Sequence, residues 1–214
     1  LTTGKIENIK SHLTNKSIEL IVGSADDEKI MEPLIQKCDC VFHLAATVGV
    51  ELILAQPMRT IHNMFDTTAV VMKMASRYRK KVLLTSTSEV YGKSSDVPFL
   101  EDGDRLEGPT TTHRWAYASV KALDEFLALA YYKIEGLPVS IVRLFNTVGP
   151  RQSANYGMVI PKMVSASLAN QDLKVHGDGL QTRCFCHVHE AVQGIKLVME
   201  SDDCNGEVIN VGSD

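Results

Sequence analysis

One stretch of the sequence decides the fold: Lys81-Val-Leu-Leu-Thr-Ser-Thr-Ser-Glu-Val-Tyr-Gly92. Its three consecutive apolar residues are typical of a buried strand, and hydroxyl side chains follow them directly. Residues 57–78 and 115–133, on either side, carry apolar side chains at helical spacing. A buried strand between two long helices predicts a parallel sheet packed between helices.

The same alternation continues outward from this stretch. Strands are expected at 18–22, 39–43 and 139–144, and an amphipathic helix at about 28–36. Gly149-Pro150 then changes the direction of the chain, and the pattern loosens into shorter segments. We therefore predict an α/β fold with a second, smaller unit after residue 150.

The composition excludes several classes of protein. The chain has 214 residues, of which 44% are hydrophobic and 22% charged, so disorder and disulfide-stapled miniproteins are excluded. The net charge of −4 argues against nucleic acid or an anionic membrane as the main partner. No apolar run approaches the roughly 18 residues of a membrane span, and the N-terminus lacks a signal-peptide layout. We expect a cytoplasmic protein.

Seven residues are the candidates for a metal site: Cys38, Cys40, Cys184, Cys186, Cys204, His187 and His189. Structural zinc favours cysteines separated by about two to four residues, whereas both cysteine pairs here have a single intervening residue. That spacing also suits a strand, where both side chains point to the same face. We expect reduced thiols, ordinary histidines and no metal.

Tyr117 and Lys121 lie four residues apart in the expected helix, so both side chains emerge from one face. A nearby ammonium favours the phenolate and should lower the pKa of Tyr117 toward that of a general base. The alternative is an exposed helical pair without a catalytic role. The hydroxyl run 85–88 follows a buried strand, where it could orient a substrate alcohol. Together these groups suit oxidation of a carbinol, whose hydride needs a cofactor as acceptor.

Five ordered motifs resemble the extended short-chain dehydrogenases, the NAD-dependent epimerases, dehydratases and decarboxylases of nucleotide sugars. The resemblance covers essentially the whole chain. Its motifs are His43-Leu-Ala-Ala46, Thr87-Ser-Glu-Val-Tyr-Gly92, Arg114-Trp-Ala-Tyr-Ala-Ser-Val-Lys121, Arg143-Leu-Phe-Asn-Thr-Val-Gly-Pro-Arg151 and Gln181-Thr-Arg-Cys-Phe185.

The resemblance implies a Rossmann-like, doubly wound parallel sheet that binds NAD. It places this NAD-binding domain at residues 1–150 and part of a nucleotide-sugar-binding domain, interleaved with the sheet, at 151–214. It also implies a UDP-sugar as the substrate and a homodimer as the assembly.

The same resemblance implies roles for individual residues. Tyr117 would be the base, Lys121 would assist it and hold the nicotinamide ribose, and Thr87 would contact the sugar C4 oxygen. Ser88 and Glu89 complete the catalytic candidates. The further cofactor-binding candidates are Ala45, Ala46, Asn63 and Thr85. The substrate diphosphate would be held by Asn146 and Arg183, although Arg183 could also be an ordinary surface arginine.

The sequence departs from the family pattern in several places. It contains no Gly-x-x-Gly-x-x-Gly turn, and Ser24-Ala25 stands where an acidic and an apolar residue usually contact adenine. His189 occupies the place of a usual Asp. We expect that both ends are truncated and the first βαβ unit is missing, so that this chain alone would bind NAD poorly and be inactive.

The residues after Thr87 narrow the expected reaction. Ser88 replaces the Asp that serves as the acid in 4,6-dehydratases, which argues against dehydration. Glu89 makes the pattern most similar to UDP-glucuronate decarboxylases, and uronate 4-epimerases share much of it; Glu89 as a loop cap is the simpler alternative. A 4-epimerase of neutral UDP-hexoses and a non-catalytic NAD-binding protein remain open as alternatives.

Overall fold

A four-stranded parallel sheet lies at the centre of the computed structural model, which describes residues 4–46, 55–153, 158–175 and 177–213. The strand order is β1-β2-β3-β6. Its strands are β1 (Cys40–His43), β2 (Lys81–Thr87), β3 (Val139–Leu144) and β6 (Val208–Val211). Every neighbouring pair in this sheet is parallel. The predicted α/β fold with a Rossmann-like parallel sheet is confirmed.

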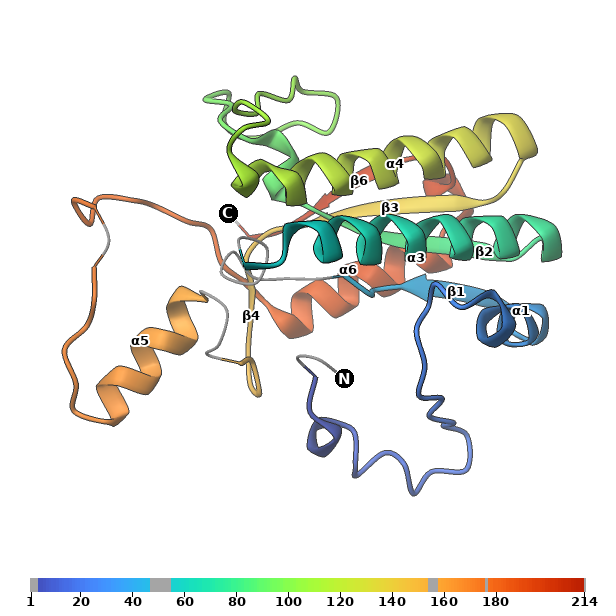
Figure 1. The fold of residues 1–214 in the computed structure, drawn as a ribbon, viewed down its shortest axis with the longest axis horizontal. Helices are drawn as coiled ribbons and strands as arrows, with labels where there is room; N and C mark the ends of the chain where they lie inside the picture. The colour runs from blue at the N-terminus through green and yellow to red at the C-terminus, as the bar shows by residue number, and fades with distance from the viewer. Residues whose placement is uncertain (1–3, 47–54, 154–157, 176, 214) are drawn as a thin grey trace.

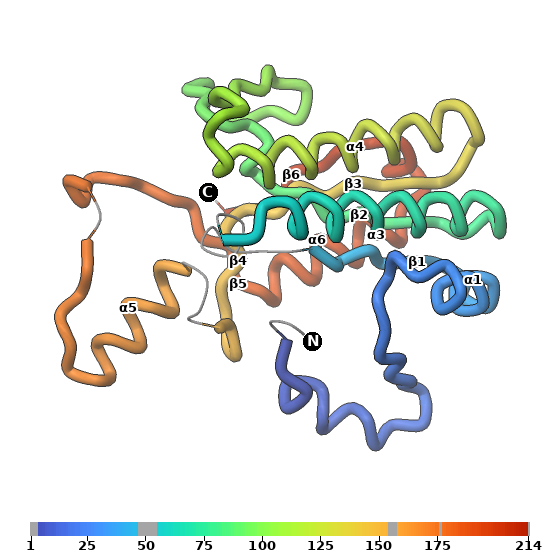
Figure 2. Tube along the Cα trace, viewed as in Figure 1, coloured from blue at the N-terminus to red at the C-terminus, as the bar shows by residue number. Residues whose placement is uncertain are grey.

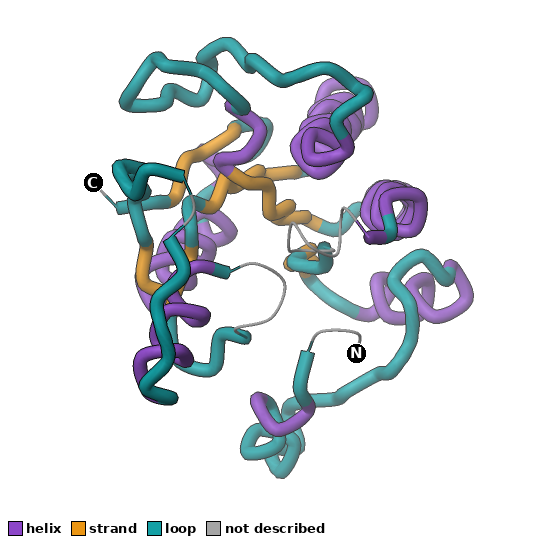
Figure 3. Tube along the Cα trace, turned by 60° about the vertical axis from the view of Figure 1, so that its left-hand side comes forward, coloured by secondary structure: helices purple, strands orange, loops and turns teal. Residues whose placement is uncertain are grey.

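Helices cover both faces of the sheet, as Figures 1 and 3 show. One layer contains α1 (Glu28–Lys37), α3 (Pro57–Tyr78) and α4 (Ala116–Glu135), and the other contains α6 (Val188–Glu200). The continuous apolar run in β2 reflects this burial on both sides. Val82 and Leu84 pack toward the α3–α4 layer, whereas Leu83 packs with Val198 and Met199 on the α6 side.

The chain after β3 forms a smaller unit beyond the carboxyl ends of the main-sheet strands (Figures 1 and 2). A two-stranded parallel sheet joins β4 (Thr147–Val148) to β5 (Cys186–His187), and α5 (Val159–Leu168) lies between them in sequence. The chain then returns through α6 to β6, which pairs with β3 in the main sheet. Short 3-10 helices occur at Ile6–Asn8, Ser88–Tyr91, His113–Trp115 and Asp202–Cys204.

The expected strand at 18–22 is wrong. Residues 18–22 have no regular structure, and β1 at the sheet edge pairs only with β2. Val22 is 77% exposed, and Ile18, Leu20 and Ile21 are 40–45% exposed. An apolar run becomes a strand only where a partner strand and a core receive it, and neither does so here. The ranges expected for the long helices and the other strands agree with the structure to within a few residues.

Helix ends follow ordinary capping chemistry. The side chain of Asp27 accepts a hydrogen bond of 2.9 Å from the backbone N–H of Lys29 and so begins α1. Gly136 ends α4 in the left-handed conformation, with φ of 68°. In the part of the chain that the structure describes, no helix combines the length and apolarity needed to cross a membrane.

Candidate functional site

The largest candidate site is a cavity of about 460 Å³ at the carboxyl ends of β1, β2 and β3. This is the edge at which open parallel sheets bind their ligands. Nine of the residues singled out from the sequence line it. They are Ala46, Thr85, Thr87, Ser88, Glu89, Tyr117, Lys121, Asn146 and Arg183.

The end of β2 and the start of α4 place a hydroxyl beside a phenol. Thr87 is the last residue of β2. Its Oγ1 accepts a hydrogen bond of 3.2 Å from the backbone N–H of Glu89 and so caps the short helix Ser88–Tyr91. Tyr117 lies in the first turn of α4. A hydrogen bond with Thr87 stabilises the ionised phenol and lowers the pKa of Tyr117. The pair is therefore arranged to hold a hydroxyl oxygen and to move its proton.

The pKa of Tyr117 is nevertheless raised to about 12. Burial is the main cause because it disfavours the phenolate, and the negative charges of Glu89 and Asp124 add to it. The expectation that Lys121 lowers this pKa is therefore wrong for the isolated chain. The charge of Lys121 is compensated by Asp124, whose Oδ2 lies 3.3 Å from the ammonium Nζ.

Glu89 and Arg114, which also line the cavity, form an ion pair. Arg114 Nη2 lies 3.5 Å from Glu89 Oε2, and both side chains are about half exposed. The guanidinium of Arg114 also lies over the ring of Trp115, with its Cζ 5.1 Å from the ring centroid. The carboxylate of Glu89 therefore has the Arg114 guanidinium as its ion-pair partner at the cavity.

The far end of the cavity belongs to the smaller unit. Asn146 Nδ2 donates a hydrogen bond of 3.0 Å to the carbonyl of Cys184, which ties the loop after β3 to the segment before β5. Arg183 is exposed and donates from Nη1 to the carbonyl of Thr182 at 2.6 Å. Its guanidinium still has donors free to bind an anion.

Comparison with known proteins identifies the family. A family profile described as GDP-mannose 4,6 dehydratase matches residues 1–214. The chain belongs to this family. The resemblance to the extended short-chain dehydrogenases is thereby confirmed.

Three similar proteins are a decarboxylase, an epimerase and a dehydratase. A UDP-N-acetyl-alpha-D-glucosaminuronate decarboxylase of Bacillus cytotoxicus is 45% identical, over 92% of this chain and 61% of that protein. The structure of a UDP-N-acetylglucosamine 4-epimerase from Methanobrevibacter ruminantium is 33% identical, with a TM-score of 0.87 over 99% of this chain and 66% of that one. A dTDP-glucose 4,6-dehydratase from Bacillus anthracis, in complex with NAD, is 27% identical with a TM-score of 0.86; the match covers all of this chain and 64% of that one.

The chain therefore spans about three fifths of the length of the decarboxylase that it matches. Two residues expected at the cofactor groove of this family member do not line the cavity. Ala45 precedes the lining residue Ala46 in the sequence but does not itself line the cavity. Asn63 is exposed on α3, where its backbone carbonyl accepts a hydrogen bond from Thr67.

The sequence reasoning also missed site residues of this family member. Arg114 is one of them: it precedes Tyr117 by three residues, about one helical turn, and this spacing indicates that the two side chains share one face of the helix. Asp124 follows Lys121 by one helical turn, which was also a usable signal, whereas His43 on β1 and Thr68 on α3 are linked to this pair by no local pattern in the sequence.

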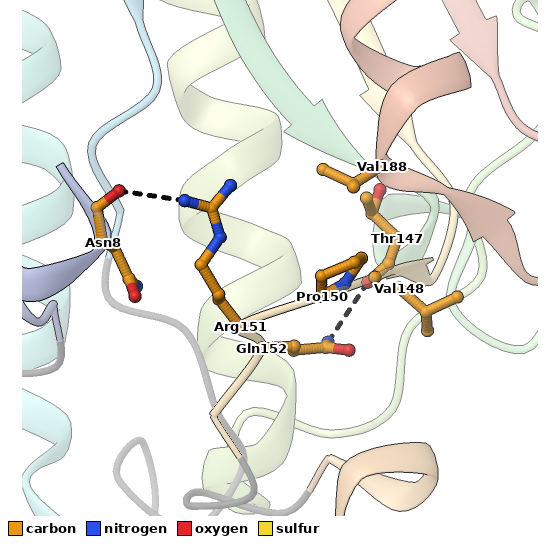
Figure 4. Close-up of a pocket in the computed structure, with 8 residues that line it drawn as sticks. Asn8, Thr147, Val148, Pro150, Arg151, Gln152 and Val188 are labelled. Atoms are coloured by element: carbon orange, nitrogen blue, oxygen red, sulfur yellow. Dashed lines mark hydrogen bonds between the residues drawn. The ribbon is translucent and has the colours of Figure 1, made fainter. Parts of the chain in front are cut away.

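A second cavity of about 400 Å³ is lined mainly by the loop at residues 147–152 (Figure 4). Arg151 donates from Nη1 to the carbonyl of Asn8 at 3.0 Å, and Gln152 donates from Nε2 to the carbonyl of Thr147 at 3.2 Å. None of the residues that line it belongs to the catalytic candidates. The catalytic candidates therefore lie in the larger cavity, of about 460 Å³.

Proposed function

We propose that the whole protein is an NAD-dependent decarboxylase of a UDP-linked uronate, which begins by oxidising C4 of the sugar. The observation that carries this proposal is the cavity that combines Thr87, Tyr117 and Lys121 with Glu89 and Arg183. Ser88, also in its lining, replaces the acid that a dehydratase needs. The 45% identity to a UDP-linked uronate decarboxylase supports the same reaction.

The residues present fit the nicotinamide half of NAD. Lys121 could hold the ribose, with Tyr117, Thr85 and Ala46 lining the cavity beside it. These groups converge at the carboxyl edge of the sheet, where dinucleotides bind in this class of fold. When bound, NAD would supply the hydride acceptor that no side chain can provide.

The side chains of the chain itself would carry the proton transfer. Tyr117 Oη would take the proton from the substrate O4, while Thr87 would hold that oxygen and stabilise the phenolate. Loss of this proton together with the C4 hydride leaves a ketone that is β to the C6 carboxylate. The C5–C6 bond then breaks, carbon dioxide leaves, and the electron pair of the bond moves to the carbonyl oxygen.

The diphosphate of the substrate would bind to polar and cationic side chains of the cavity. Arg183, and Asn146 beside it, would bind the diphosphate, because guanidinium groups match phosphate oxygens in geometry and charge. Glu89 would act on the sugar ring after C4 oxidation, held by Arg114.

The test is incubation of the whole protein with UDP-glucuronate and with its 2-acetamido analogue, followed by mass analysis of the sugar. A loss of mass equal to carbon dioxide supports the proposal. An unchanged mass with inverted C4 would establish a uronate 4-epimerase, the second candidate; a UDP-N-acetylglucosamine 4-epimerase is among the related structures. Turnover of UDP-glucose or UDP-galactose alone would overturn the uronate substrate, and no turnover with NAD bound would favour a non-catalytic protein.

Glu89→Gln is expected to slow release of carbon dioxide while the first hydride transfer continues. The carboxylate is proposed to act only after C4 oxidation, so its loss should fall on the later step. In a single turnover with the UDP-uronate, the absorbance of reduced nicotinamide should therefore rise and persist. Asp96→Asn, an exposed carboxylate in the same loop, is the control. Parent-like kinetics for Glu89→Gln would assign Glu89 a structural role.

Domain division and assembly extend the proposal. We propose an NAD-binding domain at residues 1–150 and part of a sugar-binding domain at 151–214, which is interleaved because β6 returns to the main sheet.

We also propose a homodimer through α3 and α4, which pack together and leave Leu123 and Phe126 largely exposed. Sedimentation equilibrium of the whole protein measures the assembly, and a monomeric mass at micromolar concentration would contradict it.

A further inference from the structure

We propose that Asp124 is a positioning residue that fixes the ammonium of Lys121 through a buried polar chain, which continues to Thr68 and His43. The importance of Lys121 to catalysis rests on the proposed function. The polar chain itself rests on contacts between α4, α3 and β1. It places a carboxylate behind the lysine of the candidate site and outside the cavity lining.

The first link is the ion pair on α4. Asp124 follows Lys121 by one helical turn, and Oδ2 lies 3.3 Å from Nζ. Only 1% of the Asp124 side chain and 2% of the Lys121 side chain are exposed. Solvent therefore screens the pair little, and the carboxylate restricts where the ammonium can lie.

The second link crosses from α4 to α3 and β1. Thr68 on α3 stabilises the Asp124 carboxylate with a hydrogen bond, and its Oγ1 lies 3.1 Å from Nε2 of His43 and 3.1 Å from the carbonyl of Met64. The hydroxyl has a single proton, which goes either to Asp124 or to Met64. When it goes to Asp124, the chain reads from His43 Nε2–H through the Thr68 hydroxyl to the carboxylate.

The charges along this chain make Asp124 the counter-ion. Burial, with the charge of Lys121 as a second cause, lowers the pKa of His43 to about 4, so His43 is neutral at physiological pH. Glu125, which also acts on Lys121, is engaged by Arg143 through Nη2 at 2.8 Å. Of the charged groups facing the ammonium, Asp124 is the one in direct contact with it.

One atom of Asp124 is unfavourably placed. Its Oδ1 is fully buried and has no hydrogen-bond partner among the described residues. An unpaired buried oxygen is unfavourable, and an apolar residue at this position would avoid it. The ion pair with Lys121 offsets this cost, because a buried ammonium needs a negative charge beside it.

The consequence for Lys121 can be measured without turnover. Burial lowers the pKa of Lys121, and the charge and hydrogen bond of Asp124 oppose that change. Asp124→Asn removes the charge and keeps the shape. We expect it to lower the pKa of Lys121 further, by about one unit or more, and Asp124→Glu to restore part of the difference. NMR of the whole protein with ¹³C-labelled lysine follows this titration, with Lys121→Arg assigning the signal.

Two further measurements separate positioning from general stability. Ala128→Gly, at a buried position of the same helix, should lower the melting temperature and leave the titration of Lys121 unchanged. NAD⁺ affinity, measured by calorimetry, should fall in Asp124→Asn and recover in Asp124→Glu. Thr68→Val removes the hydroxyl with little change in shape, and it should shift the titration of Lys121 in the same direction by a smaller amount.

The outcomes distinguish this proposal from the proposed function. If Lys121 titrates alike in the parent, Asp124→Asn and Thr68→Val, the positioning role is wrong. Should Asp124→Asn fail to fold, Asp124→Glu and Thr68→Val still decide it. If the whole protein turns over no UDP-sugar, the proposed function fails, whereas the titration of Lys121 continues to test the polar chain.

Discussion

Tyr117→Phe is expected to lower kcat by about 10²–10⁴-fold in the whole protein, the usual contribution of a general base. The substitution removes only the hydroxyl that Thr87 contacts, so the ring still fills its place in the first turn of α4. NAD⁺ affinity should therefore stay near that of the parent. Steady-state kinetics with the UDP-uronate and calorimetry with NAD⁺ give the two values.

The pH dependence of kcat/KM is a second test of Tyr117 as the general base. Burial raises the pKa of Tyr117 to about 12, so the ionised phenol is scarce at neutral pH and becomes more abundant as the pH rises. The kcat/KM of the parent should accordingly increase toward alkaline pH, and a positive charge bound nearby would move this rise to lower pH. Tyr117→Phe should lose the rising limb. Tyr132→Phe, a partly exposed tyrosine on the same helix, is the matched control. Equal turnover by Tyr117→Phe and the parent would remove the assignment of the base.

The parts of the fold that were predicted correctly are those whose burial follows from the sequence. The apolar run Val82–Leu84 is buried on both faces, and its length and flanking helices leave few alternatives to a central parallel strand. The cluster of site residues was also predictable. Thr87 and Asn146 follow neighbouring strands, and the carboxyl ends of parallel strands meet at one edge.

The parts that could not be predicted depend on what the chain meets in space. Residues 18–22 have the composition of a strand, but strand formation also requires a partner beside them. The pKa of Tyr117 was expected to fall because Lys121 is near in sequence. Its rise comes mainly from burial, with the charges of Glu89 and Asp124 adding to it, and the burial depends on how α4 packs against the sheet and α3. A contact such as His43 with Thr68 joins residues 25 positions apart and leaves no local signal.

The largest loss of stability is expected for Arg143→Met. Arg143 on β3 forms a two-pronged ion pair with Glu125 on α4, in which Nε lies 3.1 Å from Oε1 and Nη2 lies 2.8 Å from Oε2. Both side chains are more than nine-tenths buried. Nη1 also donates to the Tyr91 hydroxyl at 2.8 Å, and that hydroxyl donates to Asn210 on β6 at 2.8 Å. The pair therefore joins α4, β3, β6 and the loop after β2.

Removing Arg143 alone leaves the Glu125 carboxylate buried without its cation. Such a change typically costs about 3–5 kcal/mol, because an uncompensated charge remains in a medium that solvates it poorly. Urea unfolding of the whole protein, followed by tryptophan fluorescence, should show the loss as a lower midpoint with little change in slope. Arg77→Met breaks the exposed pair with Glu32 and should change the free energy of unfolding by about 1 kcal/mol or less.

The double variant Glu125→Leu/Arg143→Met separates charge from packing. If the cost comes from the unpaired carboxylate, removing Glu125 as well should return a large part of the lost stability, because two apolar side chains can replace a buried ion pair. Recovery should remain incomplete, since Ser86 loses its acceptor Glu125 and the Tyr91 hydroxyl loses its donor Arg143. A double variant as unstable as the sum of the two single variants would show that shape, and not charge, is what Arg143 contributes.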